Sequence, residues 1–335
     1  MSERITLGYG SGGELYHRLI EEVFLPAFDN EYLRTLADSA VCPIDRGSLA
    51  MTTDSFVVEP LFFPGGDIGR LAVCGTVNDL AMSGAKPLYL TVGMIIVAGF
   101  PKEDLMRLCH SMTAAAQEAG VLIVTGDTKV VEKGSCDKLF INTSGVGSLP
   151  HGPVLAPEKV KPGDRIIVSG TLGDHGMAVM ASRHKLEFTP ELRSDVAPLN
   201  SLVQAAIAES GAVKLMRDPT RGGAASTLNE WADSTGRQFM IREDALPVAD
   251  NVRAACDLLG IDPLYCANEG KMLLVVEAAK AEDVLRRLQG HPLGRQSAII
   301  GEVGDSAEPG VYIDTLIGSR RLVGVIDGEQ LPRIC

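Results

Sequence analysis

Four aspartates are the residues whose type and placement best suit a chemical role. Each is expected where a strand or helix meets a loop, and they are Asp54, Asp79, Asp127 and Asp218. Hard divalent ions such as Mg²⁺ prefer oxygen ligands and often bridge carboxylates to the phosphates of a substrate. A single aspartate in such a place is also typical of a helix cap or a turn. At this point both the metal-binding and the structural interpretation stay open.

The last aspartate opens a motif that suits a charged phosphate better than simple helix capping. Asp218-Pro219-Thr220-Arg221-Gly222-Gly223 adds an arginine and two glycines at the predicted start of a helix. Arginine and a helix N-terminus both offer N–H groups to an anion. Lys129, just after Asp127, is placed to contact a transferred phosphoryl group, although a single lysine is by default a solvated surface residue. Glu269 precedes a predicted strand and is either a general base or an ordinary turn residue, and taken alone it favours the turn.

A glycine-rich segment near the N-terminus, Gly8-Tyr9-Gly10-Ser11-Gly12-Gly13, is followed by a helical pattern. Its spacing satisfies G-x-G-x-x-G, but the dinucleotide-binding fingerprint needs a central strand before it, which seven residues hardly supply. We therefore reject a Rossmann-type site. The loop can still offer backbone amides to an anion, and a flexible lead-in fits about as well. The sequence contains no Walker P-loop, HExxH or GxSxG motif.

The last residue, Cys335, suggests a different kind of chemistry. Prenylation requires a cysteine fourth from the end, so that interpretation fails. A thiol on a tethered arm can carry a group into a pocket, because the tether raises its effective concentration. Pro332 and the polar residues before it argue against a packed terminal helix, so we expect a mobile arm.

The periodicity of apolar residues predicts two mixed α/β halves that would position these groups, divided by a proline- and glycine-rich stretch at 151–163. In the first half we expect helices over 15–28, 68–84 and 101–119, strands over 48–53, 88–97 and 139–146, and a short buried strand over 121–125. In the second half we expect helices near 199–209, 222–233, 249–259 and 280–288, and strands over 165–169, 238–241, 272–276 and 298–303.

Composition narrows the class of protein. A chain of 335 residues is enough for about two domains. Its 31 basic and 43 acidic residues give a net charge of -12, which argues against a nucleic-acid partner. The seven cysteines form no Cys-x-x-Cys pair and fit a reducing cytoplasm. The longest uncharged stretch, between Lys86 and Lys102, is shorter than the roughly 20 residues of a membrane span, and no secretory signal is recognisable, so we expect a soluble protein.

Taken together, these motifs resemble the HypE family of hydrogenase maturation proteins, in order and over nearly the whole chain. The matching segments are 10–13, 52–55, 62–69, 75–79, 125–131, 137–143, 218–223, 267–271 and 332–335. The aspartates and glycine loops are shared with aminoimidazole ribonucleotide synthetase, selenophosphate synthetase and thiamine monophosphate kinase, which bind ATP without a P-loop. The Pro-Arg-Ile-Cys terminus is the feature specific to HypE. One departure is Tyr9, where the family often has histidine.

The resemblance implies a two-domain PurM-like fold of the α/β (α+β) class. The N-terminal domain, 1–155, would bind ATP and form a homodimer through a β-barrel-like interface. A C-terminal α/β domain, 156–325, and a mobile tail, 326–335, would follow. The resemblance further implies a cytoplasmic protein that uses ATP and Mg²⁺. Its partners would be the carbamoyltransferase HypF and the HypC-HypD complex, with no nucleic acid and no membrane.

The resemblance also implies a reaction. The partner would load Cys335 with a carbamoyl group, and the chain would dehydrate it with ATP to a thiocyanate (S-cyanate), the source of the cyanide ligand on the iron of [NiFe]-hydrogenase. The implied catalytic residues are Cys335, Lys129 and Glu269. The implied ligands of Mg²⁺-ATP are Asp54, Asp79, Asp127 and Asp218, and the other implied ATP contacts are Asn78, Thr128, Thr220, Arg221, Gly222, Gly10, Gly12 and Gly13.

Two other functions stay open. One is a different ATP-dependent small-molecule enzyme of the superfamily, which would not need the tail. Selenophosphate synthesis is disfavoured, because the glycine loop at 8–13 contains no cysteine. The other is a non-catalytic, nucleotide-binding maturation scaffold that only presents Cys335 to its partners. ATP turnover by the carbamoylated protein would distinguish an enzyme from a scaffold.

Overall fold

The computed structural model describes residues 13–19, 21, 40–44, 47–149, 155–208, 211–306, 308–325, 331 and 333–335. Helix α1 (Glu14–Leu19) follows Gly13, whose carbonyl accepts a hydrogen bond from the backbone N–H of His17 (3.2 Å). Most of the helix expected over 15–28 lies outside the described residues, as do Gly10 and Gly12. None of the described helices is both long and apolar enough to cross a membrane.

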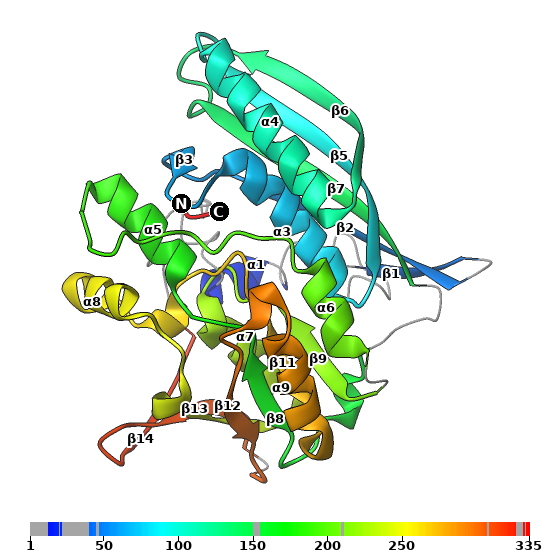
Figure 1. Cartoon of the computed structure of the whole chain (residues 1–335), viewed down its shortest axis with the longest axis vertical. Coiled ribbons are helices and arrows are strands. Elements are labelled where there is room, and N and C mark those ends of the chain that lie inside the picture. The colour runs from blue at the N-terminus through cyan, green and yellow to red at the C-terminus, as the bar shows by residue number, and fades with distance from the viewer. Residues whose placement is uncertain are drawn as a thin grey trace, which may run out of the picture.

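The N-terminal domain is a five-stranded sheet with two helices against one face (Figure 1). The strand order is β1 (Ala40–Ile44), β2 (Gly47–Phe56), β7 (Leu139–Leu149), β5 (Lys86–Val97) and β6 (Leu122–Val131). The helices are α3 (Ile68–Met82) and α4 (Lys102–Ala119), and a small hairpin, β3 (Phe62–Phe63) and β4 (Gly66–Asp67), precedes α3. Nearly all of α3 is buried, because it lies between the sheet and the second domain. This helix therefore forms the centre of the protein.

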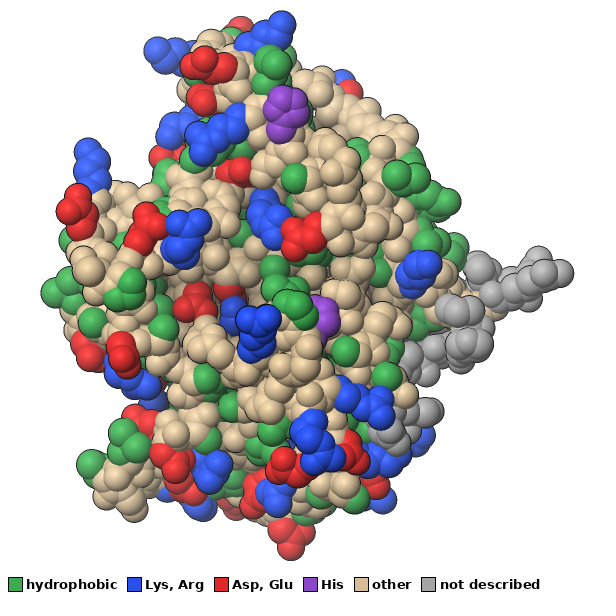
Figure 2. Space-filling model, in the orientation of Figure 1, with side chains coloured by type: hydrophobic (Ala, Val, Ile, Leu, Met, Phe, Trp, Pro, Cys, Tyr) green, Lys and Arg blue, Asp and Glu red, His purple; other side chains and the backbone are tan. Residues whose placement is uncertain are grey.

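The opposite face of this sheet is exposed. Met51, Tyr89 and Ile95 are each close to half exposed, and the edge strand β6 exposes apolar side chains as well. Hydrophobic side chains accordingly gather along the right-hand edge of the upper domain in Figure 2. Elsewhere on that view acidic and basic side chains are mixed, with no broad basic area. An exposed apolar sheet face of this kind is typical of an interaction surface.

The C-terminal domain is a seven-stranded, mainly antiparallel sheet with helices on both faces. Its strand order is β14 (Arg320–Leu322), β13 (Gly310–Asp314), β10 (Gln238–Arg242), β12 (Ala298–Val303), β8 (Arg165–Val168), β11 (Leu273–Val276) and β9 (Val213–Arg217). Its helices are α5 (Asp174–His184), α6 (Asn200–Ile207), α7 (Gly223–Thr235), α8 (Asp250–Leu259) and α9 (Ala281–Gln289). Ile166 and Val168 face α7, whereas Ile167 between them faces α6 and α9, so one strand supplies two hydrophobic cores.

Several expected boundaries were wrong in ways that matter for the site. The strand expected to be short and buried at 121–125 runs as β6 to Val131 and is exposed almost throughout. Strand β2 likewise continues past Asp54 to Phe56. Asp54 and Asp127 therefore lie within strands and Asp79 lies within α3, so only Asp218 directly follows the end of an element. Helix α5 and strands β9, β13 and β14 had no counterpart among the sequence predictions.

Asn78 on α3 joins the two domains. Its side-chain amide donates to the carbonyls of Ala197 (3.1 Å) and Glu269 (3.3 Å), and its oxygen accepts from the backbone N–H of Leu199 (2.7 Å). The side chain is fully buried. These bonds fix an extended segment of the second domain, 194–199, against the first domain. Asn78 was expected to contact ATP, but in this structure its polar atoms are used for the joint between the domains.

Replacing Asn78 with alanine should lower the free energy of unfolding by about 2–4 kcal/mol, because three hydrogen bonds to buried backbone groups are lost, although the carbonyl of Glu269 keeps a second donor, the N–H of Ala197. The measurement is urea unfolding of both proteins, with Asn251→Ala as the control. Asn251 is an exposed asparagine that also bonds main-chain carbonyls, and its loss should change stability by less than about 1 kcal/mol. Unchanged stability of Asn78→Ala, combined with weaker ATP binding, would support a ligand-binding role instead.

Candidate functional site

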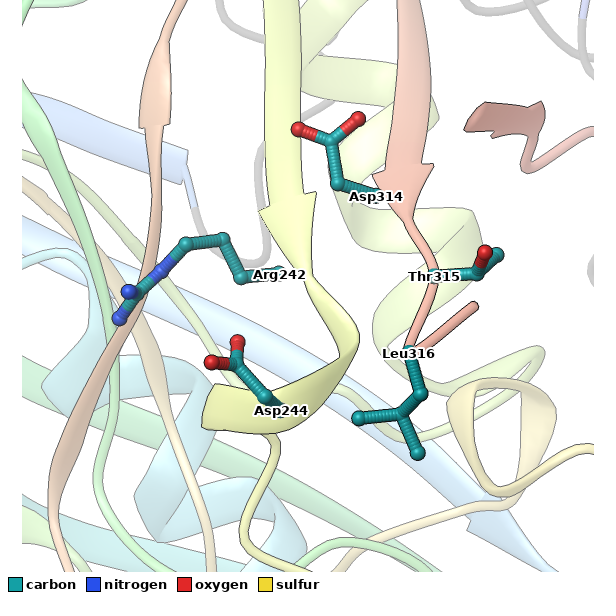
Figure 3. A pocket seen from close by; sticks show the side chains of 5 residues that line it. All are labelled: Arg242, Asp244, Asp314, Thr315 and Leu316. Atoms are coloured by element: carbon teal, nitrogen blue, oxygen red, sulfur yellow. The ribbon is translucent and has the colours of Figure 1, made fainter. Parts of the chain in front are cut away.

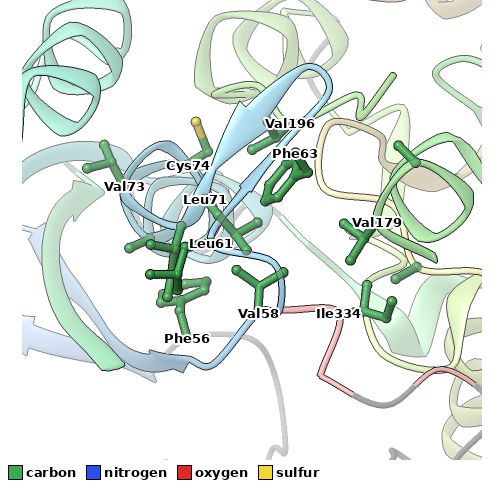
Figure 4. Packing of buried hydrophobic residues seen from close by; sticks show 14 of the residues in the cluster. Phe56, Val58, Leu61, Phe63, Leu71, Val73, Cys74, Val179, Val196 and Ile334 are labelled. Atoms are coloured by element: carbon green, nitrogen blue, oxygen red, sulfur yellow. The ribbon is translucent and has the colours of Figure 1, made fainter. Parts of the chain in front are cut away.

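The end of the chain is docked at the joint between the two domains. The backbone N–H groups of Val57 and Glu59 donate to the main-chain oxygens of Cys335 (3.4 Å) and Arg333 (3.2 Å), in the alternating manner of an antiparallel strand pair. The side chain of Ile334 is 3% exposed and packs in the hydrophobic cluster shown in Figure 4, beside Val58. The arm expected to be mobile is thus anchored at its last three residues in this structure.

Four charged side chains lie close enough to influence the docked thiol of Cys335. They are Glu269, Arg221, Asp54 and Asp218. Burial raises the pKa of the thiol well above its ordinary range, the three carboxylates raise it further, and the guanidinium of Arg221 opposes them. The docked cysteine is therefore a neutral thiol at physiological pH. Because the thiolate is the nucleophilic form, this docked thiol is poorly reactive.

Glu269 is the most unusual group of the site. It is 2% exposed, and within the described part of the chain its Oε1 has no hydrogen-bond partner. Burial raises its pKa well above the ordinary value, nearby Asp218 and Asp54 raise it further, and Arg221 lowers it. A buried carboxyl group with a free oxygen and a perturbed pKa is typical of a proton-transfer residue. Between the two interpretations left open by the sequence, this geometry favours the general base over the turn residue.

The turn that carries Glu269 is packed against the motif that carries Arg221. Gly223 at the start of α7 has φ +61°, and a Cβ there would lie 2.5 Å from the carbonyl oxygen of Leu264 and 2.6 Å from that of Cys266. Only glycine permits this approach. Asn268 adds to it by donating to the carbonyl of Pro219 (3.1 Å). The glycines of the 218–223 motif thus bring its arginine beside Glu269.

Asp54 and Asp79 lie along one seam between β2 and α3. The carboxylate Oδ2 of Asp54 is 3.7 Å from where a Cβ on Gly75 would be, one helical turn before Asp79. Thr52 donates a hydrogen bond to Asp79 Oδ2 (2.8 Å). Burial raises the pKa of Asp54, and Arg221 opposes that shift. Two of the four expected aspartates are therefore near one another, and Asp218, with 4% exposure, reaches the same site from the other domain.

Asp127 and Lys129 form an exposed ion pair (3.0 Å) on β6, on the other face of the sheet. Strand register places Asp54 in a row with Thr143, whereas Asp127 belongs to the next row, which ends at Ser55. Adjacent rows of a sheet point to opposite faces, and the two aspartates are also three strands, or about 14 Å, apart. Within the described ranges, no three His, Cys, Asp or Glu side chains are grouped as metal ligands. The single chain thus does not bring the four expected aspartates together.

Four residues of the site were missed by the sequence analysis. Asp195 accepts hydrogen bonds from the backbone N–H of Glu269 (3.1 Å) and from Lys271 (3.2 Å), and His175 and Arg183 contact the docked tail. Lys271 stands in a motif that the sequence did single out, the segment 267–271, whereas His175 stands in none of the motifs named above. Asp195 and Arg183 carried no local signal, because only the tertiary fold brings them to the site.

A separate pocket of about 280 Å³ opens at the ends of β10 and β13, in the lower part of the C-terminal domain (Figures 1 and 3). It is lined by Arg242, Asp244, Asp314, Thr315 and Leu316. None of these residues was expected to take part in chemistry. This pocket is remote from the docked tail, which lies near β3 at the joint between the two domains.

The raised pKa of Glu269 predicts how stability changes with pH. Folding favours the protonated form, so its stabilising contribution is complete below the ordinary value of 4.5 and is lost as the pH rises through the folded-state pKa. Glutamine is uncharged at every pH, so a variant with glutamine at this position does not lose this contribution as the pH rises. The free energy of unfolding of Glu269→Gln, relative to the original protein, should therefore rise between pH 4 and pH 8. Urea unfolding across this range tests it, with the exposed Glu187→Gln as control, and a pH-independent difference would contradict it.

Family models match both halves of the chain. The N-terminal domain of AIR synthase related proteins matches residues 36–149, and the C-terminal domain of the same proteins matches residues 161–314. Among curated proteins, the chain is 51% identical to the carbamoyl dehydratase HypE of Cupriavidus necator, covering 100% of this chain and 95% of the relative.

Solved structures agree with this similarity. A crystal structure of a HypE-HypF complex contains a chain that superposes with a TM-score of 0.87 at 53% identity, covering 92% of this chain and 99% of that one. A HypE crystal structure in complex with ATP gives a TM-score of 0.82 at 47% identity, covering 99% and 100% of the two chains. With similarity of this extent in sequence and in fold, the chain belongs to the HypE family of carbamoyl dehydratases, within the PurM-like AIR synthase related proteins.

Proposed function

We propose that this protein uses ATP to dehydrate an S-carbamoyl group on its own Cys335 to a thiocyanate, which supplies the cyanide ligand of [NiFe]-hydrogenase. The observation that supports the proposal is the docked tail, in which the thiol of Cys335 lies within electrostatic reach of the buried carboxyl group of Glu269. A pocket for a free small-molecule substrate would not need the chain's own terminus inside it. The docked tail therefore favours this function over another small-molecule enzyme of the superfamily.

The reaction converts S–C(=O)–NH2 into S–C≡N, so the carbon–oxygen bond breaks and both N–H protons leave. ATP, when bound, would supply the phosphoryl group that makes the amide oxygen a leaving group. Glu269 would accept one proton from the amide nitrogen, because the burial that raises its pKa makes its ionised form a strong base, and the second proton would leave with the departing phosphate. Arg221 moderates that basicity and offers hydrogen bonds to phosphate oxygens.

The chain's carboxylates fit a magnesium-bound nucleotide. Asp54 and Asp218 lie within electrostatic reach of the thiol from the two domains, Asp79 lies along the same seam as Asp54, and their carboxylate oxygens are ligands that Mg²⁺ prefers. With Thr220, Gly222 and Gly13 they would contact ATP and its metal ion. One relative of the same family has been crystallised with ATP. For Asn78 the structure favours a role in the joint between the domains.

Asp127 and Lys129 would serve the active site of a second copy, whereas Thr128 between them faces the inner side of the sheet, in a row with Met94. They lie on the strand β6, which is exposed, and the apolar outer face of the same sheet is uncovered in the monomer. A homodimer formed through this face would cover it and bring Lys129 toward the partner's site. Lys129 would then polarise the amide or the transferred phosphoryl group across the interface.

Loading of the tail requires a partner. A relative is known in a complex with HypF, and we propose the same carbamoyltransferase as the donor for Cys335. The neutral docked thiol is a poor nucleophile, so loading would take place with the tail extended toward the partner. The cyanide group would pass to iron on the HypC-HypD complex. The described cysteines form no disulfide, which fits a reducing cytoplasm.

Mass spectrometry of the C-terminal peptide tests the reaction. After incubation with the carbamoyltransferase, carbamoyl phosphate and Mg²⁺-ATP, Cys335 should gain a carbamoyl group and then lose one water, and a non-hydrolysable ATP analogue should stop it at the first step. Glu269→Gln should slow the second step by at least about 100-fold with little change in ATP affinity, and Cys335→Ala should give no product. Carbamoylation that never proceeds to cyanation would instead support a scaffold.

Complementation between two inactive variants tests the shared site. In a mixed dimer of Lys129→Ala and Cys335→Ala protomers, one Cys335 faces the intact Lys129 of the other protomer, so about half of the activity should return. If Lys129 acts on the Cys335 of its own protomer, neither protomer of the mixed dimer contains both Lys129 and Cys335, and the activity stays lost. Differently tagged, co-expressed protomers allow the mixed dimer to be purified, and each homodimer serves as the control.

A further inference from the structure

The docked tail is held by two side chains of one helix. His175, in the first turn of α5, contacts the carbonyl oxygen of Ile334 through Nε2 (3.0 Å). Arg183, about two turns later on the same face, donates to the carbonyl of Arg333 (2.7 Å). The same guanidinium donates to the carbonyl of Glu59 through Nε (2.8 Å), on the segment that pairs with the tail. Two successive carbonyls of the tail are thus fixed by α5.

The protonation state of His175 follows from its partners. A carbonyl oxygen only accepts hydrogen bonds, so Nε2 carries the proton and donates to Ile334. Burial lowers the pKa of the ring, which is therefore neutral, and Nδ1 accepts from the hydroxyl of Ser194 (2.8 Å). The hydroxyl of Ser194 in turn accepts from the backbone N–H of Val196 (3.1 Å). This chain of bonds fixes the tautomer that holds the tail.

One short segment positions both the tail and Glu269. Ser194 sets the ring of His175, and its neighbour Asp195 accepts the backbone N–H of Glu269 (3.1 Å). The backbone of this segment is tied to the first domain, because the N–H of Ser194 donates to the carbonyl of Pro64 (2.8 Å). The tail and Glu269, which must meet in the reaction, are thus supported by adjacent residues of one extended segment, 194–199.

We propose that His175 and Arg183 are positioning residues that hold the last residues of the chain in register, so that the group on Cys335 meets Glu269. The reason for holding the tail rests on the proposed function, but the test of the holding does not depend on that function. Apolar packing of Ile334 by itself does not fix the position of the tail along its docking site, because it has no directional bonds. The hydrogen bonds to the carbonyls of residues 333 and 334 are directional and therefore fix the position of residue 335. Loss of either donor shifts the tail from the docked to the undocked state.

Alkylation of Cys335 measures that equilibrium without ATP or carbamoylation. The docked thiol has a raised pKa and reacts slowly, whereas an undocked thiol has an ordinary pKa near 8.5. Iodoacetamide labelling followed by peptide mass spectrometry gives the rate for Cys335 and for the exposed Cys109, which serves as the internal reference. The rate for Cys335 relative to Cys109 therefore reports the undocked fraction.

His175→Phe keeps an aromatic ring against Phe63 but removes the donor, whereas His175→Gln keeps an N–H donor near the position of Nε2. The relative alkylation rate should rise about three- to tenfold in His175→Phe and less in His175→Gln. In Arg183→Met the rate should rise by about tenfold or more, because a charged donor is lost. Arg193→Met, at a nearby arginine paired with Glu191 on the surface, should leave the rate unchanged.

Unchanged rates in both His175→Phe and Arg183→Met would overturn the proposal. A larger rise in His175→Gln than in His175→Phe would assign the effect to ring packing and overturn the role of the hydrogen bond. Unfolding midpoints and the Cys109 rate show whether a variant remains folded. If the alkylation results hold but ATP never converts a carbamoylated tail, the positioning role stands and the proposed function fails.

Discussion

The burial of a carboxyl group, that of Glu269, with one oxygen left without a hydrogen-bond partner among the described residues is the constraint on which the rest of this site depends. Leaving such a group unpaired away from water costs about 1–3 kcal/mol, and the protein retains it only because the surrounding backbone is rigid. The N–H of Glu269 is held by Asp195 and its carbonyl by Asn78, so the turn cannot relax to hydrate the carboxyl group. Each of these partners also joins the two domains or supports the tail. The architecture therefore concentrates its strain where proton transfer is needed.

The charges around the site also determine which chemical forms of Cys335 can dock there. Three carboxylates and burial disfavour a thiolate at the docked position, whereas a neutral thiol or a neutral S-carbamoyl group meets no such penalty. Loading of sulfur needs the thiolate and dehydration needs the neutral thiocarbamate, so the two steps have opposite electrostatic requirements. A tail that leaves the site for the first step and docks for the second satisfies both. In such a cycle the mobility expected from the sequence would serve the first step, and the anchoring found in the structure would serve the second.

Local patterns predicted the elements better than they predicted the site. Helices α3, α4 and α7 follow apolar periodicity and were expected within a few residues, whereas β13 and β14 are short strands with little pattern of their own. Glu269 was ambiguous in sequence because only burial distinguishes a base from a turn residue. Asp195 and Arg183 gave no signal, since their importance arises from backbone groups distant in the chain. The spacing of residues in the sequence does not reveal side chains that form hydrogen bonds with the main chain of a distant segment.

The pleat of one sheet explains why the aspartates could not be assigned to a single site from the sequence. Whether two residues face each other depends on odd or even position along a strand and on register between strands, and Asp54 and Asp127 differ in that parity across three pairings. Motifs that follow one another along the sequence can therefore lie on opposite faces of the sheet. The inner face is closed by α3, and the outer face is left open with apolar side chains beside Lys129. If both sets of residues serve one reaction, the outer set must act on another protomer, and the active site is then a property of the dimer.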